Sequence, residues 1–157
     1  MIKTGLILGL SAVVASAWFM PTMNIGKNND NTNIDKNFQR DAQKEIVIDK
    51  KTSKIYSDVK PSKKMHFYGA WDYCQKMDLA GYDDWRVITK DEARDLLELS
   101  RSKVNVKHAF RNVKEEIYWT STQDRFGEAW YIDFDLGRYS TKKETYKYRA
   151  ICTRDIK

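Results

Sequence analysis

Apolar side chains recur at helical spacing in two stretches of the chain. In the first they occupy positions i, i+3, i+4, i+7 and i+10, which places them on one face of a helix: Phe67, Ala70, Trp71, Cys74 and Met77. The second stretch opens with Thr89-Lys-Asp-Glu92, which matches a capping box and predicts that a helix begins there. The core face of this second helix is predicted to be Ala93, Leu96 and Leu97.

Other apolar positions form short or alternating runs that are typical of β-strands. Residues 45–49 and 54–58 predict an opening hairpin, and residues 117–122 predict a strand in the last third. In 129–135, alternation places Asp133 and Asp135 with Tyr131 on the face opposite Trp130, Ile132 and Phe134. In 146–153, Tyr148, Ala150 and Cys152 lie opposite Lys147, Arg149 and Ile151. The stretch 100–114 lacks clear periodicity and is interpreted as a long basic loop.

The N-terminus resembles an export signal. Lys3 precedes an apolar stretch that ends in Ala15-Ser-Ala17, a small-x-small cleavage pattern, so residues 1–17 predict a signal peptide. The alternative is an uncleaved anchor that extends to about residue 23. Residues 18–44 are polar and rich in Asn and predict a flexible tether, which leaves 45–157 as the domain. Either alternative predicts export, with the domain in the periplasm, at the cell surface or secreted, or held at the inner membrane by the anchor.

The two cysteines predict a disulfide. Cys74 lies on the inner face of the first helix and Cys152 on the inner face of the last strand, and exported proteins oxidise such pairs. A pair of buried free thiols is the alternative for a cytosolic chain. Two Cys and two separated His cannot supply the ligands of a structural zinc site.

Composition limits the number of domains and the class of binding partner. The chain has 157 residues and a net charge of +6, with 41% hydrophobic and 13% aromatic residues, enough for one packed domain. A basic chain suggests nucleic acid as a partner, but predicted export argues against it, and the aromatics lie at core-facing periods.

Several motifs together resemble the Lcl C-terminal domain family, named for a Legionella collagen-like adhesin. They are Ala70-Trp-Asp-Tyr-Cys74, Leu79-Ala-Gly-Tyr-Asp-Asp-Trp-Arg86, Tyr118-Trp-Thr-Ser-Thr122, Ala129-Trp-Tyr-Ile-Asp-Phe134 and Arg149-Ala-Ile-Cys-Thr-Arg154. The resemblance covers about residues 45–155 and assigns structural roles to Trp71, Trp85, Arg86, Trp119 and Trp130.

The resemblance implies an exported bacterial domain with a C-type-lectin-like α+β fold. We therefore expect two helices packed on short, mainly antiparallel strands, with one disulfide. The founding adhesin's domain is associated with sulfated glycans. Two departures weaken the transfer of a ligand site: Val87-Ile88 stands where the family commonly has Leu-Pro, and Ile151 stands where an Arg often precedes the last Cys. The triplets of calcium-dependent lectins are missing, so calcium-type sugar binding is not expected.

Two basic segments are the candidate binding residues for an anionic ligand. The loop contributes Arg101, Lys103, Lys107, Arg111 and Lys114, and the C-terminal region contributes Lys142, Lys143, Lys147 and Arg149. Guanidinium and ammonium groups suit sulfate or phosphate. The alternative is a solvated cationic loop that keeps the protein soluble. The sequence does not indicate whether the two segments converge.

The acidic pairs Asp83-Asp84 and Asp133-Asp135 are interpreted as turn and outward-face residues, so no metal site is predicted. Arg86 is predicted to pair with a buried carboxylate or carbonyl. No catalytic motif and no cofactor site is present. We therefore expect a noncatalytic, adhesin-like binding module for anionic glycan or another acidic surface. The alternative is a structural or assembly module of the bacterial envelope that binds a protein.

Overall fold

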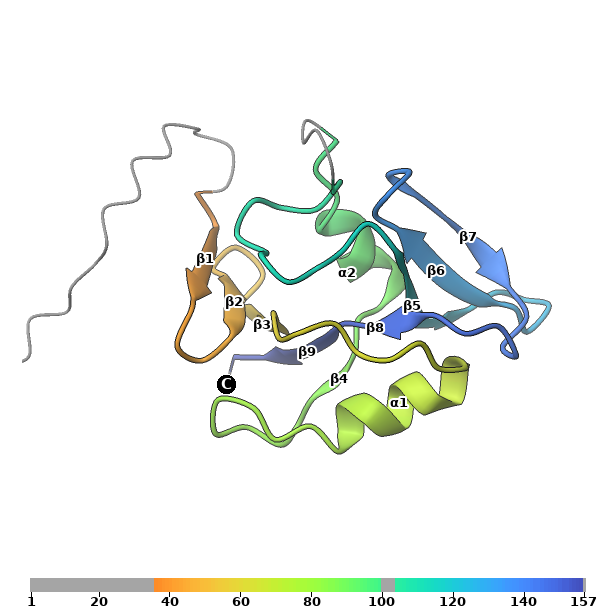
Figure 1. Cartoon of the computed structure of the whole chain (residues 1–157), viewed down its shortest axis with the longest axis horizontal. Helices are drawn as coiled ribbons and strands as arrows, with labels where there is room; N and C mark the ends of the chain where they lie inside the picture. Colours follow the sequence, from red (N-terminus) through yellow and green to blue (C-terminus); the bar gives the residue numbers. More distant parts are fainter. Residues whose placement is uncertain (1–35, 100–103, 157) are drawn as a thin grey trace, which may run out of the picture. The chain divides into compact units, whose positions relative to one another are not determined.

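The computed structural model describes residues 36–99 and 104–156, whose regular elements are mostly strands in two sheets (Figure 1). The predicted signal peptide or anchor, and the tether up to residue 35, lie outside the described residues.

The larger sheet has five strands in the order β1-β2-β3-β9-β4, and every neighbouring pair is antiparallel. Its members are β1 (Phe38–Asp41), β2 (Ile46–Asp49), β3 (Lys54–Ser57), β9 (Cys152–Asp155) and β4 (Arg86–Val87). The predicted opening hairpin is confirmed as β2 and β3. The folded part begins earlier than residue 45, because β1 pairs with β2 within the predicted tether. Only Phe38 is apolar in β1, so no alternating pattern announces this strand.

The smaller sheet has four strands in the order β7-β6-β5-β8. They are β7 (Arg138–Lys142), β6 (Ala129–Asp133), β5 (Ile117–Gln123) and β8 (Arg149–Ala150). The β5–β8 pair is parallel, whereas β5–β6 and β6–β7 are antiparallel. Ile151 alone separates β8 from β9, so the C-terminal segment contributes a strand to each sheet.

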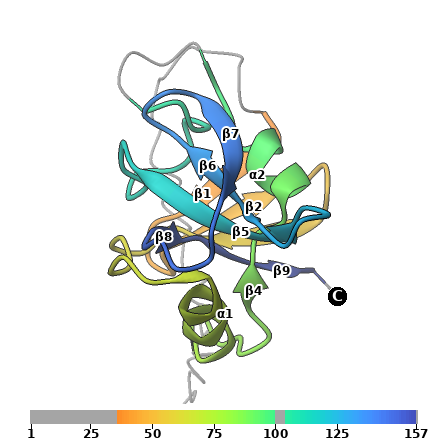
Figure 2. The ribbon, with the colours of Figure 1, turned by 90° about the vertical axis from the view of Figure 1, so that its right-hand side faces the viewer.

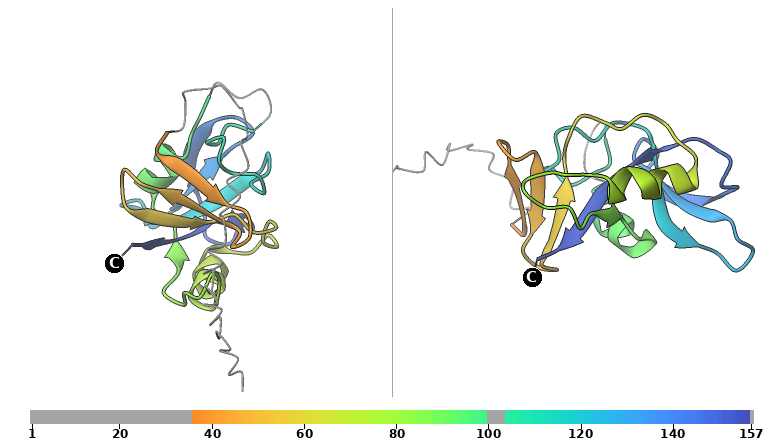
Figure 3. Two further views of the ribbon diagram at one scale, coloured as in Figure 1. Left: turned by 90° about the vertical axis from the view of Figure 1, so that its left-hand side faces the viewer. Right: turned by 90° about the horizontal axis from the view of Figure 1, so that it is seen from below.

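Two short helices complete the described elements: α1 (Phe67–Gln75, 9 residues) and α2 (Lys90–Asp95, 6 residues). The α+β class, with two helices packed on strands, was therefore the wrong expectation for this mostly β structure. The helical patterns are real, but they end after about two turns. Seen from below in Figure 3, α1 runs past the place where the sheets meet, in contact with β4, β5 and β8. No helix in the described part of the chain is long and apolar enough to span a membrane.

The capping box of α2 forms as predicted. The Thr89 hydroxyl accepts from the Glu92 amide at 3.2 Å, and the Glu92 carboxylate accepts from the Thr89 amide at 2.7 Å. Figure 2 shows α2 beside β5 and β6, on the other side of the strands from α1. The short helix is thereby fixed at its N-terminus, where the backbone donors of any helix lack partners.

Two hydrophobic clusters share strand β5, because its successive side chains point in opposite directions. Trp119 lies in a cluster with Phe67 and Trp85, whereas Tyr118 lies in the other cluster with Leu96 and Phe110. Both faces of the smaller sheet are therefore covered over β5.

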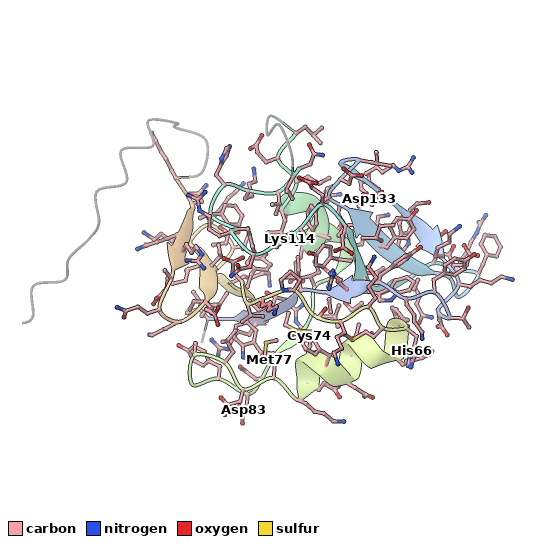
Figure 4. All side chains as sticks on the ribbon, viewed as in Figure 1. His66, Cys74, Met77, Asp83, Lys114 and Asp133 are labelled. Atoms are coloured by element: carbon pink, nitrogen blue, oxygen red, sulfur yellow. A yellow bond between two sulfur atoms is a disulfide. The ribbon has the colours of Figure 1, made fainter. Side chains whose placement is uncertain are left out.

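The predicted disulfide is confirmed. Cys74 and Cys152 are bonded, with their Cα atoms 5.5 Å apart, and both residues are fully buried in the first cluster. The bond ties α1 to β9 (Figure 4).

Two predicted orientations are wrong. Trp71 lies at the edge of the buried face of α1 and remains 41% exposed, although its ring contacts Phe67 at 6.2 Å between centroids. In β6 both faces are buried: Tyr131 packs in the first cluster and Ile132 in the second. Asp133 is also buried, because its carboxylate accepts the amides of Asp135 and Leu136 and closes the turn after β6.

Candidate functional site: a cationic hollow

A group of exposed cations surrounds a hollow of about 810 Å³, which we call the cationic hollow. It is lined by Lys60 and Pro61, by residues of the loop 104–116, and by Arg149 at the start of β8. The side chains of Lys60, Arg111 and Lys114 are exposed at its rim. The lining also contains apolar side chains, among them Phe110 and Val113, and the carboxylates of Glu115 and Glu116. Figure 4 labels Lys114, which lies on the loop above the middle of the molecule.

The rim cations are not neutralised by protein carboxylates. Among the residues that the structure describes, no carboxylate forms an ion pair with Lys60, Arg111 or Lys114. Their charges are therefore available to an anion that enters the hollow. Glu115 also lines the hollow and reduces, without cancelling, its positive charge.

Backbone contacts fix the loop that carries two of these cations. The amide of Lys114 donates to the Tyr118 hydroxyl at 2.9 Å, and the amides of Arg111 and Asn112 donate to the Asp58 carboxylate. Burial raises the pKa of Tyr118 to about 12, so its hydroxyl stays neutral at physiological pH. Buried Phe110 and Val113 anchor the same loop in the second hydrophobic cluster.

The base of the hollow contains an ion triad. Arg149 Nη2 and Lys64 Nζ each lie 2.7 Å from the Glu116 carboxylate, and Arg149 also donates to the Ser62 carbonyl. The hydrogen bonds from Arg149 and Lys64 lower the pKa of Glu116 to about 2. Arg149, which was predicted to bind a ligand, lines the hollow, and its guanidinium contacts Glu116 and the Ser62 carbonyl.

The sequence profile described as the Lcl C-terminal domain matches residues 37–154. The chain belongs to the Lcl C-terminal domain family. No curated protein matches the chain significantly. The match begins at the residue before β1, which agrees with the structural boundary of this Lcl C-terminal domain rather than with residue 45.

Of the remaining predicted ligand residues, the four that the structure describes do not line the hollow. Lys107 of the Lcl C-terminal domain is half-buried and lies 3.2 Å from Glu98. Lys142 lies over the ring of Tyr146, at 5.1 Å from its centroid, and Lys143 lines a separate hollow with Phe126. Lys147 is exposed, outside both linings. Arg101 and Lys103 lie outside the described residues. Among the described residues, the two basic segments converge through Arg149, which lines the hollow with Arg111 and Lys114.

Sequence reasoning missed the third basic segment, Lys60-Pro-Ser-Lys-Lys64. Lys60 lines the hollow, Lys64 pairs with Glu116 below it, and Lys63 is exposed between them. The signal that could have found this segment is its composition, with three lysines in five residues.

The paired Arg86 behaves as predicted. Its guanidinium donates to both oxygens of Glu92, at 2.8 and 2.7 Å, in the bidentate geometry that only arginine provides. Burial opposes ionisation of Glu92, but hydrogen bonds from Arg86, Thr89 and Lys54 outweigh it and lower the pKa of Glu92 to about 2.

The predicted structural tryptophans divide into two groups. Trp85 and Trp119 are fully buried, and their indole groups donate to the carbonyls of Tyr82 and Met65 at 2.9 Å. Trp130 is half-buried and carries the Lys90 ammonium 3.6 Å from its ring centroid. Together with exposed Trp71, it contributes little to the core.

The acidic residues form no metal site in the described part of the domain. No group of three or more His, Cys, Asp or Glu side chains is arranged there to hold an ion. Asp84 lies 2.5 Å from Arg154, Asp133 closes a turn, and Asp83 and Asp135 are exposed. Figure 4 labels Asp83 and Asp133, which lie far apart on the molecule.

Proposed function

We propose that this Lcl C-terminal domain is a noncatalytic, adhesin-like module that binds an anionic glycan in the cationic hollow. The observation that carries the proposal is a set of exposed cations that form no ion pair with any described carboxylate: Lys60, Arg111 and Lys114. Sulfate and carboxylate groups on a sugar match these donors, and the half-buried Pro61 and Val104 offer apolar surface for the face of a sugar ring. A volume of about 810 Å³ accommodates a short oligosaccharide segment.

Binding without calcium follows from the same arrangement. The ligand's charge meets ammonium and guanidinium groups directly, so no bridging cation is needed. Chelation is therefore expected to leave binding unchanged.

Two features support an exported module without catalysis. A disulfide between fully buried cysteines suits an oxidising compartment outside the cytoplasm. The same bond leaves neither cysteine as a thiolate nucleophile. Export places the domain where it meets the glycans of other cells or of the envelope.

The test compares two triple variants of equal charge on a heparin column. Lys60→Ala/Arg111→Ala/Lys114→Ala removes three charges from the rim, and Lys142→Ala/Lys143→Ala/Lys147→Ala removes three charges elsewhere. Because an exposed ion pair contributes about 0.2–1 kcal/mol, we expect the rim variant to bind heparin about tenfold more weakly and to elute at lower salt. The control should change much less.

Equal weakening in both triple variants would show that net charge alone attracts heparin. Unchanged retention of the rim variant would refute the hollow as the binding site. Repeating the run with chelator separates a calcium-dependent mode from the proposed direct one.

A further inference from the structure

Asp58 lies at the junction of the two walls of the cationic hollow. It directly follows β3 and precedes Lys60 by two residues, so its own chain continues into one wall. The residue is 1% exposed, and its carboxylate is fully shielded from solvent. A buried carboxylate is costly unless several donors compensate it.

The backbone donors that compensate the Asp58 carboxylate come from the loop 110–114. The amide of Asn112 donates to the carboxylate at 2.9 Å, and the amide of Arg111 donates to both oxygens at 3.2 Å. The Asn112 side-chain amide donates to the Asp58 carbonyl at 2.5 Å. One residue therefore joins the segment 58–61 to the loop 110–114 across 53 positions of sequence.

The choice of backbone donors matters for binding. An ion pair between Asp58 and the Arg111 guanidinium would neutralise the charge that a ligand needs. The carboxylate instead contacts the Arg111 amide, so the loop is fixed while the guanidinium stays exposed at the rim. Charge-assisted hydrogen bonds of this kind are among the stronger ones in proteins.

Arg40 is the cation that pairs with the Asp58 carboxylate. Arg40 of β1 donates from Nε to the Asp58 carboxylate at 2.6 Å and is 22% exposed. The edge strand β1 thereby contacts the residue that organises the hollow, although β1 itself is absent from the lining.

We propose that Asp58 is the positioning residue of the cationic hollow, and that Arg40 holds its carboxylate in place. The proposal rests on the proposed function of the hollow. Asp58 fixes the two backbone segments that carry Lys60 and Arg111, so these like charges stay near each other despite their repulsion. Loss of its charge frees the loop 110–114 and weakens anion binding without removing any rim cation.

The experiment compares Asp58→Asn with Asp49→Asn in the full chain. Asp49 is an equally buried carboxylate at the end of β2, and it accepts from the Lys51 amide and the Thr52 hydroxyl in a turn outside the cationic hollow. Amide hydrogen exchange at Arg111 and Asn112 measures how firmly the loop 110–114 is held, and heparin retention measures anion binding. Asp58→Asn should speed exchange of both amides about tenfold or more and lower the eluting salt. Asp49→Asn should change neither.

Each outcome decides between the proposals. Unchanged exchange at Arg111 and Asn112 in Asp58→Asn overturns the positioning role. Faster exchange with wild-type retention also overturns it, and the proposed function still stands if the rim triple variant loses retention. Retention that survives the rim triple variant overturns both proposals.

Arg40→Gln provides a second variant in case Asp58→Asn fails to fold. This variant keeps the hydrogen bonds from the Arg111 and Asn112 amides to the Asp58 carboxylate and removes only the hydrogen bond from Arg40 of β1. We expect an intermediate increase in exchange at Arg111 and Asn112 and an intermediate loss of retention. Wild-type behaviour in both measurements would remove Arg40 from the mechanism.

Discussion

The domain has two groups of cations, one paired with carboxylates and the other not paired with any described carboxylate. In the paired group, Lys54 and Arg86 contact Glu92, and Arg154 contacts Asp84. In the cationic hollow, Lys60, Arg111 and Lys114 line a concave surface without protein counterions among the described residues. This difference shows that a binding surface cannot be identified by counting basic residues. What matters is which of them the protein's own carboxylates have already neutralised.

The largest expected effect on the free energy of unfolding comes from the disulfide, because it closes a long loop. Cys152 lies between Arg149 of the hollow and Arg154 of the paired group, so the bond holds the strand segment that joins the two groups. The bond joins residues 78 apart in sequence. The chain-entropy model gives a stabilisation of about 4 kcal/mol for such a loop. The double variant Cys74→Ala/Cys152→Ala should lose about this much unfolding free energy in urea. A loss below about 1 kcal/mol would contradict this account.

Glu92→Gln should have the next largest effect, since it removes the charge at the centre of the paired group. We expect a loss of about 2 kcal/mol at pH 6, because Arg86 loses its bidentate partner and the helix cap is weakened. Heparin retention should not fall. The control is Asp91→Asn in the same helical turn, whose exposed carboxylate should matter by less than about 0.5 kcal/mol.

The pH dependence of the same variant sharpens the test. The pKa of Glu92 in the folded protein is lowered to about 2, below its ordinary value near 4.3. The carboxylate therefore makes its full contribution to folding stability at pH values above the ordinary pKa. This contribution is lost as pH falls through about 2. The gap between wild type and Glu92→Gln in urea midpoint should therefore narrow from pH 5 to pH 2. A constant gap would show that the carboxylate's charge is not what stabilises the paired group.

The smallest expected effect on stability belongs to the hollow. Lys60→Ala/Arg111→Ala/Lys114→Ala removes exposed side chains without neutralising partners, so the unfolding free energy should change by no more than about 0.5 kcal/mol per residue. Thermal or urea unfolding measures this. A large loss would mean that these side chains stabilise the fold, and the contrast with the paired group would disappear.

Local patterns predicted the parts of the fold that depend on neighbouring residues. The capping box at Thr89 and the β2–β3 hairpin are examples, because each forms within a few residues of sequence. The inward cysteines also predicted the disulfide correctly. The helices were too short to make the domain α+β, and the polar strand β1 left no periodic signal.

The candidate site was less predictable, because it depends on contacts between distant segments. Arg111 and Lys114 were identified from their charge, and both line the hollow. Lys60 was missed because the sequence does not show that it lies near Arg111. The two are brought together where Asp58 accepts from the Arg111 amide, across 53 positions of sequence. Arg149 and Lys107 were predicted to bind a ligand, and the structure pairs them with Glu116 and Glu98, which the sequence did not indicate. Sequence shows the charges, and only the fold shows how they are paired.

The passage of the chain from β8 to β9 also has a consequence for folding order. β8 completes the smaller sheet beside β5, and β9 enters the larger sheet between β3 and β4. Both sheets therefore need residues 149–155, and neither is complete until this segment has paired. Contacts of such long sequence separation slow folding. One short segment thus couples the completion of the two sheets, so that neither is expected to form fully without the other.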